Sequence, residues 1–121
     1  MEFGYVIPLG VVDKQNDLVE PDSLKRAIEK YTKDNGKVYL GFNGLPELAG
    51  KITKVQYYDD SISIVVDLKE YLSLVAGTFG ISYSFMVESE SIGMGGYGNV
   101  RNLVVSEILE LALIPRERLL W

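Results

Sequence analysis

Three acidic residues near the N-terminus have the residue type and spacing of an oxygen-ligand metal site. Asp13 and Asp17 lie four positions apart, and Glu20 follows closely. Carboxylates grouped in this way suit calcium or magnesium. An EF-hand loop, however, needs more carboxylates, a central glycine and a terminal glutamate at fixed spacing. We therefore expect a structural turn, in which aspartate side chains accept hydrogen bonds from nearby backbone N–H groups, and neither a metal site nor a cofactor site.

A glycine-rich run, GMGGYG at residues 93–98, matches the pattern of a dinucleotide-binding loop. Such a loop holds a pyrophosphate when a strand precedes it and a helix follows it. The residues after Gly98 have the pattern of a strand, so no helix dipole would face a phosphate group. We predict a flexible connection between two strands that binds no nucleotide.

Ser82 is a candidate nucleophile within a stretch, residues 81–87, whose alternation predicts a strand. A serine hydroxyl is a poor nucleophile until a neighbouring base takes its proton. The sequence contains no histidine and no cysteine. Within this chain, that composition excludes a Ser–His or Cys–His mechanism, disulfides, and zinc sites built on those two ligands. Taken alone, Ser82 is an ordinary strand serine.

A second stretch, VYLGFNGLPELAG at residues 38–50, has the form of a site whose central residue has been replaced. A β-rich run enters the glycine-bracketed tetrapeptide GFNG, and Asn43 stands where a catalytic residue would be expected. An amide oxygen accepts a hydrogen bond but takes no proton at neutral pH. Asn43 therefore cannot act as a general base.

The composition is that of one globular domain, residues 1–121, with 47% hydrophobic and 24% charged residues. The formal net charge of -5, with basic residues scattered along the chain, argues against a nucleic-acid partner. No signal peptide is visible, and no apolar run is long enough to span a membrane.

The hydrophobic pattern predicts an α+β domain that is mainly β, a small curved sheet or β-barrel with two flanking helices. The clearest helix spans residues 22–35, with Asp22 as its N-cap and an apolar stripe at Leu24, Ala27, Ile28 and Tyr31. A second helix is expected after Asp67, with a stripe at Leu68, Leu72 and Val75. Strands are expected at 3–12, 38–42, 52–58, 61–67, 81–87 and 102–114, the last of them central in the sheet.

Read in order, three segments resemble the prohead (capsid maturation) serine proteases of tailed bacteriophages, whose fold is like that of herpesvirus assemblin. Residues 4–28 are similar to the opening strand, the following helix and the D-x-x-G-D-x-V-x-P turn between them, here Asp13, Asn16, Asp17, Val19 and Pro21. Residues 43–51, NGLPELAGK, are similar to the H-D-x-x-x-x-x-G segment, which closes at Gly50. GISYSFMV at 80–87 is similar to the S-x-G-F segment that carries the nucleophile, and LVVSEILELALIP at 103–115 resembles the last strand.

This resemblance implies site residues by position. Ser82 stands at the nucleophile, Asn43 stands at the general-base histidine, and Glu110 lies near the third, acidic partner. The resemblance also implies that Asn43 and Ser82 are adjacent in space. Gly44 replaces the acidic residue after the histidine and Ser84 replaces the glycine of the nucleophile segment, which favours a natural inactive homologue over a histidine replaced by design.

Three functions follow from this sequence. The first is a prohead-protease-like phage or prophage protein without catalytic activity that has a structural or assembly role in the capsid. The second is an active maturation protease that uses Ser82 with another base; Lys37 and Lys51 flank the Asn43 segment, and lysine serves as the base in some serine enzymes. The third is a small binding module unrelated to phage assembly.

The resemblance also implies partners and a location. A capsid or scaffold protein is the expected partner, in the cytoplasm of a bacterial host and in the prohead or virion. A homodimer is expected as well, since Leu119, Leu120 and Trp121 form an apolar tail that needs cover. No nucleic-acid partner and no membrane association are expected.

Overall fold

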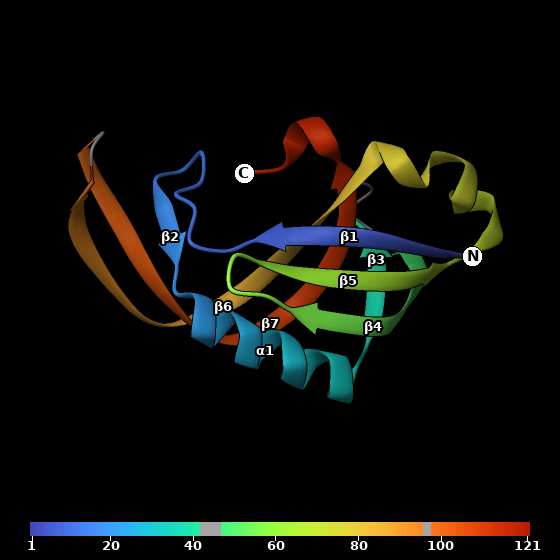
Figure 1. The fold of residues 1–121 in the computed structure, drawn as a ribbon, viewed down its shortest axis with the longest axis horizontal. Helices are drawn as coiled ribbons and strands as arrows, with labels where there is room; N and C mark the ends of the chain where they lie inside the picture. The colour runs from blue at the N-terminus through green and yellow to red at the C-terminus, as the bar shows by residue number, and fades with distance from the viewer. Residues whose placement is uncertain (42–46, 96–97) are drawn as a thin grey trace.

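The computed structural model describes residues 1–41, 47–95 and 98–121, and these form one curled seven-stranded sheet with a helix packed against it (Figure 1). The mainly β, α+β class predicted from the sequence is confirmed. No helix in the described residues is long and apolar enough to cross a membrane. In chain order the elements are β1 (Glu2–Pro8), β2 (Asp17–Val19), α1 (Pro21–Asp34), β3 (Lys37–Leu40), β4 (Glu47–Tyr57), β5 (Ser61–Leu68), the 3-10 helix η1 (Glu70–Thr78), β6 (Phe79–Gly95), β7 (Gly98–Pro115) and the 3-10 helix η2 (Arg116–Arg118).

β7 is the central strand of the sheet, as its apolar sequence predicts. The strand order is β1-β5-β4-β3-β7-β2, and β6 also pairs with β7. β6 is antiparallel to β7 over almost its whole length, from Phe79 opposite Pro115 to Gly95 opposite Gly98. β3 and β2 both run parallel to β7, at Val38–Leu40 and at Asp17–Val19. Because β6 occupies one edge of β7, these two short strands share the other edge.

The ribbon of β6 and β7 bends through register shifts. The shifts lie between Ser84 and Phe85, between Met86 and Val87, and between Val87 and Ser89. Each such bulge adds a residue to one strand and increases the local twist. Beyond the last bulge, residues 89–95 and 98–104 form a hairpin that stands away from the body of the domain (Figure 1) and is called the arm below.

Helix α1 packs the predicted stripe into the core but begins differently from the prediction. Leu24, Ala27, Ile28 and Tyr31 are all buried. The N-cap is Glu20, whose carboxylate accepts a hydrogen bond from the backbone N of Ser23 at 2.8 Å, and not Asp22. The physical reason is Pro21, which occupies the first helical position, where a backbone N–H is not needed.

The second predicted helix is a run of 3-10 turns. Asp67 and Leu68 remain in β5, and the backbone N of Lys69 still donates to the carbonyl of Ala49 on β4. Helical turns therefore start only at Glu70. Of the predicted stripe, Leu72 is buried within η1, whereas Val75 is 42% exposed.

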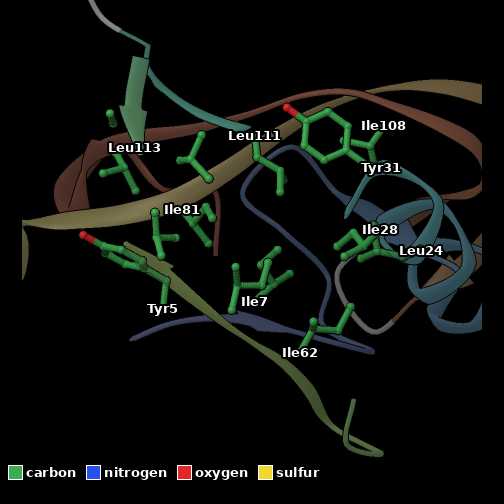
Figure 2. Close-up of a cluster of buried hydrophobic side chains, with 14 of the residues drawn as sticks. Tyr5, Ile7, Leu24, Ile28, Tyr31, Ile62, Ile81, Ile108, Leu111 and Leu113 are labelled. Atoms are coloured by element: carbon green, nitrogen blue, oxygen red, sulfur yellow. The ribbon is translucent and has the colours of Figure 1, made fainter. Parts of the chain in front are cut away.

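The core lies between the curled sheet and α1. Figure 2 shows Tyr5 and Ile7 of β1 and Ile62 of β5 facing Ile81 of β6 and Leu111 and Leu113 of β7. The strand alternation predicted for β5 holds, because Ile62, Ile64 and Val66 are each 0% exposed.

The C-terminal tail packs on the domain itself, and Leu119, Leu120 and Trp121 are all partly buried. Trp121 stacks on Tyr83 with ring centroids 5.8 Å apart. Leu119 lies directly against Gly80, where a Cβ would collide with its side chain. Lys14 donates from its backbone N to the carbonyl of Leu120 and from its ammonium group to that of Leu119.

The burial of α1 predicts a large effect of truncation at Ile28, which is 0% exposed. Ile28→Ala should lower the free energy of unfolding by about 2–5 kcal/mol, because it removes buried apolar contacts and leaves a cavity. Urea denaturation measures this loss. Arg26→Ala, on the exposed face of the same helix, should stay within roughly half a kcal/mol of the unmodified protein. A similarly small loss for Ile28→Ala would place the predicted stripe in solvent.

Candidate functional site

Two of the three predicted site residues line one depression on the outer face of the β6–β7 ribbon. Ser82 is paired with Ala112, and Ser84 is paired with Glu110. Residues two apart on a strand share a face, so these four side chains lie on the face opposite the buried Ile81, Leu111 and Leu113. The depression has a volume of about 290 Å³ and is lined by Gly41, Ser82, Tyr83, Ser84, Glu110, Ala112 and Ile114.

The third predicted residue, Asn43, lies outside the described residues, and so does Gly44. The chain reaches that segment from the depression, because Gly41 is one of its lining residues. The backbone N of Gly41 donates to the carbonyl of Leu113 at 3.2 Å. A Cβ on Gly41 would approach the Cβ of Ala112 at 3.2 Å. This close approach of β3 to β7 leads the chain to the edge of the depression just before Asn43.

The side chains of Ser82 and Glu110 are available for chemistry or binding. Both are half-buried, and within the described residues neither side chain has a hydrogen-bonding or ion-pair partner. A carboxylate and a hydroxyl on one face can orient a polar ligand, but a hydroxyl becomes a nucleophile only with a base in reach.

Neither lysine that flanks the Asn43 segment lines the depression. Lys37 and Lys51 are paired with each other across β3 and β4, and both are exposed. Lys37 also lies four residues before Gly41, about 13 Å along an extended strand. A lysine that serves as a base has to be desolvated enough to lose its charge. The exposed position of these two side chains does not provide that environment.

The acidic residues near the N-terminus are used to build the fold. Asp13 accepts hydrogen bonds from the backbone N of Gln15 at 2.8 Å and of Asp17 at 3.0 Å. Asp17 is 6% exposed and accepts two hydrogen bonds from the guanidinium of Arg101, at 2.7 and 2.8 Å. These contacts are those of the predicted structural turn. Among the described residues, no group of three or more histidine, cysteine, aspartate or glutamate side chains could hold a metal ion.

Glu20 has a structural use as well. Partial burial alone would raise the pKa of its carboxyl group, but hydrogen bonds from Ser23 lower that pKa below its ordinary value. Ser23 then connects the helix to the central strand, since its hydroxyl donates to the carbonyl of Glu20 and accepts from the backbone N of Val105. The start of α1 is therefore tied directly to β7.

Backbone conformation and close packing explain the residue types at two further motif positions. Asn16 stands where the resembling turn has glycine, and its φ is 60°. Asparagine is one of the few residues that adopts this left-handed conformation at low cost. Gly50, the closing glycine of the second segment, pairs with Leu68, and a Cβ there would collide with the carbonyl oxygen of Asp67.

The glycine-rich run is part of a hairpin. Gly93 to Gly95 belong to β6, Gly98 opens β7, and Gly95 is paired with Gly98. Residues 96 and 97 lie outside the described residues. Because a strand follows Gly98, the run lacks the helix that a dinucleotide-binding loop requires. The described residues of the run belong to the arm, and none of them lines the Ser82 depression.

Sequence reasoning missed the apolar walls of the site and the partner of Asp17. Ala112 and Ile114 follow Glu110 at intervals of two along β7, so strand periodicity could have placed them on the face of Ser82. No pattern in the sequence predicts that Arg101 pairs with Asp17. Arg101 meets Asp17 only because β2 pairs with β7 across 84 residues of sequence.

Comparison with known proteins reveals a related fold. No protein-family profile and no curated protein sequence matches the chain. Among solved structures, the chain is similar to the capsid assembly protease gp21 of bacteriophage T4, with a TM-score of 0.66 and 12% sequence identity. The match covers 94% of this chain and 82% of that chain. The fold is therefore prohead-protease-like.

The raised pKa values of the buried Tyr5 and the partly buried Tyr83 predict a loss of stability at alkaline pH. Burial raises the pKa of Tyr83 from 10.0 to about 12, and the nearby charge of Asp13 adds to the effect; burial also raises the pKa of Tyr5 to about 12. Between these values the unfolded chain has released protons that the folded protein keeps. Stability is therefore fully present below about pH 10 and falls as pH rises toward about 12. Urea midpoints measured across this range test the effect.

Tyr83→Phe is the matched control for this pH dependence. The substitution keeps the ring that stacks on Trp121 but removes the ionisable hydroxyl group. The fall in urea midpoint between about pH 10 and pH 12 should be smaller than in the unmodified protein, because one of the raised pKa values is gone. An unchanged dependence of the urea midpoint on pH would contradict a raised pKa at the partly buried Tyr83.

Proposed function

We propose that this chain is a prohead-protease-like protein of a phage or prophage that lacks proteolytic activity and has a structural or assembly role in the capsid. One observation carries the proposal: Ser82 and Glu110 line one depression, while the sequence contains no histidine. The fold supports the prohead-protease-like part of the proposal, and the absent base supports the loss of activity.

The size of the expected defect follows from how a catalytic triad works. The base accepts the serine proton during attack and returns it to the leaving group. Removal of the base or the nucleophile alone lowers the rate on the order of a millionfold, about as much as removal of the whole triad. In this proposal Asn43 occupies the base position, where its amide orients Ser82 by a hydrogen bond but accepts no proton.

The partner in this proposal is a capsid or scaffold protein. The structurally similar gp21 is a capsid assembly protease, so a shared fold in the same process would present the Ser82 face to the same class of protein. The depression is open, and its Ala112 and Ile114 walls with the Ser82 and Glu110 polar groups suit a polypeptide segment held without cleavage. The protein would then act in the host cytoplasm and remain in the prohead or virion.

The competing function is an active maturation protease that uses Ser82 and a base other than histidine. The shared depression of Ser82 and Glu110 favours it, because a carboxylate is already in the neighbourhood of the hydroxyl. The exposed positions of Lys37 and Lys51 argue against it. The two functions differ in one measurable property, the reactivity of Ser82.

Labelling by a serine-reactive fluorophosphonate tests that reactivity. The unmodified protein should show no labelling at Ser82 and no cleavage of scaffold protein or casein, because no base activates the hydroxyl. Asn43→His restores an imidazole and should give weak labelling at best, since Gly44 and Ser84 also differ from the active pattern. Ser82→Ala identifies any signal that arises elsewhere, and an active serine protease shows that the reagent works. Labelling of Ser82 in the unmodified protein would overturn the proposed inactivity.

The same proposal includes a homodimer. Its interface would be formed by η1 and not by the C-terminal tail. On η1, Leu74 is 92% exposed, Tyr71 is 57% exposed and Val75 is 42% exposed. Large apolar side chains grouped on a surface favour an interface. Leu74→Glu should raise the dimer dissociation constant about tenfold or more in analytical ultracentrifugation, because it would bury an unpaired charge. Leu109→Glu, at a position 54% exposed on β7, is the control. The dimer would be refuted if the unmodified protein were entirely monomeric at high micromolar concentration.

A further inference from the structure

The arm leaves one strand edge open. Residues 89–95 of β6 pair in regular register with residues 98–104 of β7. β2 lies along β7, at Asp17–Val19. In the described part of the chain no strand pairs with the other edge of β6, which forms the outer side of the arm in Figure 1. Backbone N–H and C=O groups on such an edge are available to another extended chain.

A depression lies on one face of the arm and extends from β2 across β7 to β6. It has a volume of about 330 Å³ and is lined by Leu18 of β2, Glu20, Pro21 of α1, Ser89, Glu90 and Ser91 of β6, and Asn102, Leu103 and Val104 of β7. The serine side chains are short, so they leave room above the aliphatic groups of Leu18 and Val104. A strand added to β6 would direct every second side chain toward this face. The depression can therefore receive an apolar side chain of an added strand.

The charge at the edge selects the chemistry of the partner. β6 carries Glu88 and Glu90 and no basic residue, while Arg101 is the one basic residue of β7. The guanidinium of Arg101 is bonded to Asp17 at 2.7 Å and lies 3.9 Å from the carboxylate of Glu90. Asp17 thus neutralises most of its charge. The acidic edge favours lysine or arginine on the incoming chain.

The same charges disfavour a second copy of this chain at the edge. Antiparallel pairing of two β6 strands about Ser89 would place Glu88 of one copy opposite Glu90 of the other. Like charges directly opposite each other destabilise a strand pair. The bulge between Val87 and Ser89 further limits the flat length that two identical edges could share.

We propose that the open edge of β6 in the arm is a docking site for an extended basic segment of another protein. The segment adds to the sheet as a strand, directs alternate apolar side chains into the depression beside Ser89 and Ser91, and directs basic side chains toward Glu88 and Glu90. This site is separate from the depression at Ser82. The proposal of this docking site does not depend on whether Ser82 is reactive.

The probe is a capped peptide of alternating lysine and aliphatic residues, Lys-Val-Lys-Ile-Lys-Val-Lys, titrated into isotope-labelled full-length protein and followed by NMR. We expect saturable shifts of backbone amides between Glu88 and Ile92, and slower hydrogen exchange of amides on the open edge. The double variant Glu88→Lys, Glu90→Lys should weaken binding about tenfold, since it removes two attractions and adds two repulsions. The analogue peptide with glutamate in place of lysine should bind the double variant more tightly than the unmodified protein.

The control double variant Glu107→Lys, Glu117→Lys produces the same change in net charge away from the arm, and its affinity should stay within about twofold of the unmodified protein. Four results would overturn the proposal. They are the absence of saturation at millimolar peptide, shifts confined to residues outside the arm, and equal affinity for the lysine and glutamate peptides. The fourth is protection of β6 amides that increases with protein concentration alone, which would assign the edge to a second copy.

Discussion

The hydrogen-bond ladder of β7 is the constraint on which the rest of the structure depends. One edge of this strand is occupied by β6 from end to end, and the other edge receives β3 near Leu111–Leu113 and β2 near Arg101–Leu103. A parallel strand cannot reach its position through a tight turn and needs a crossover. The segment between β2 and β3 provides one with α1, which packs back on β7 and buries Ile28 and Tyr31 in the common core. The core, the Ser82 depression and the arm are thus three regions along a single strand pair.

Side-chain bonds to β7 fix the register of this arrangement. The buried carboxylate of Asp17 accepts two hydrogen bonds from the guanidinium of Arg101. The hydroxyl of Ser23 accepts one from the backbone N of Val105. An isolated buried charge is costly, so loss of Arg101 would leave the buried carboxylate of Asp17 unpaired and would destabilise the fold. The turn that resembles the phage protease pattern is explained in this chain by these contacts and by the left-handed Asn16. The residues of that turn are therefore explained by the fold, whereas Ser82, Glu110 and Asn43 form the site that we propose.

Much of the fold was predictable because local periodicity and burial agree. The stripe of α1 and the alternation of β5 each specify one buried face, and both are observed. β2 was missed because a three-residue strand has no period, and its existence rests on pairing with residues far along the chain. The second helix was predicted from a stripe that began at Leu68. The backbone N of Leu68, however, donates to the carbonyl of Met1, and that of Lys69 donates to the carbonyl of Ala49 on β4, so the first helical turn starts only at Glu70. Glu20 replaces Asp22 as the N-cap since only position 20 stands before the proline.

The candidate site divides in the same way. Strand periodicity placed Ser82 on a face away from the core, and the resemblance singled out Glu110 near the position of the third partner. The apolar walls at Ala112 and Ile114 were missed, although the period of two along β7 places them on the face of Glu110. We propose that Asn43 occupies the base position beside Ser82. A high-resolution crystal structure in which the Asn43 side chain is ordered measures this most directly. We expect the Asn43 amide within hydrogen-bond distance of Ser82 Oγ, about 2.6–3.2 Å, or joined to it through one water. A separation of more than about 10 Å, well beyond hydrogen-bond reach, would contradict it.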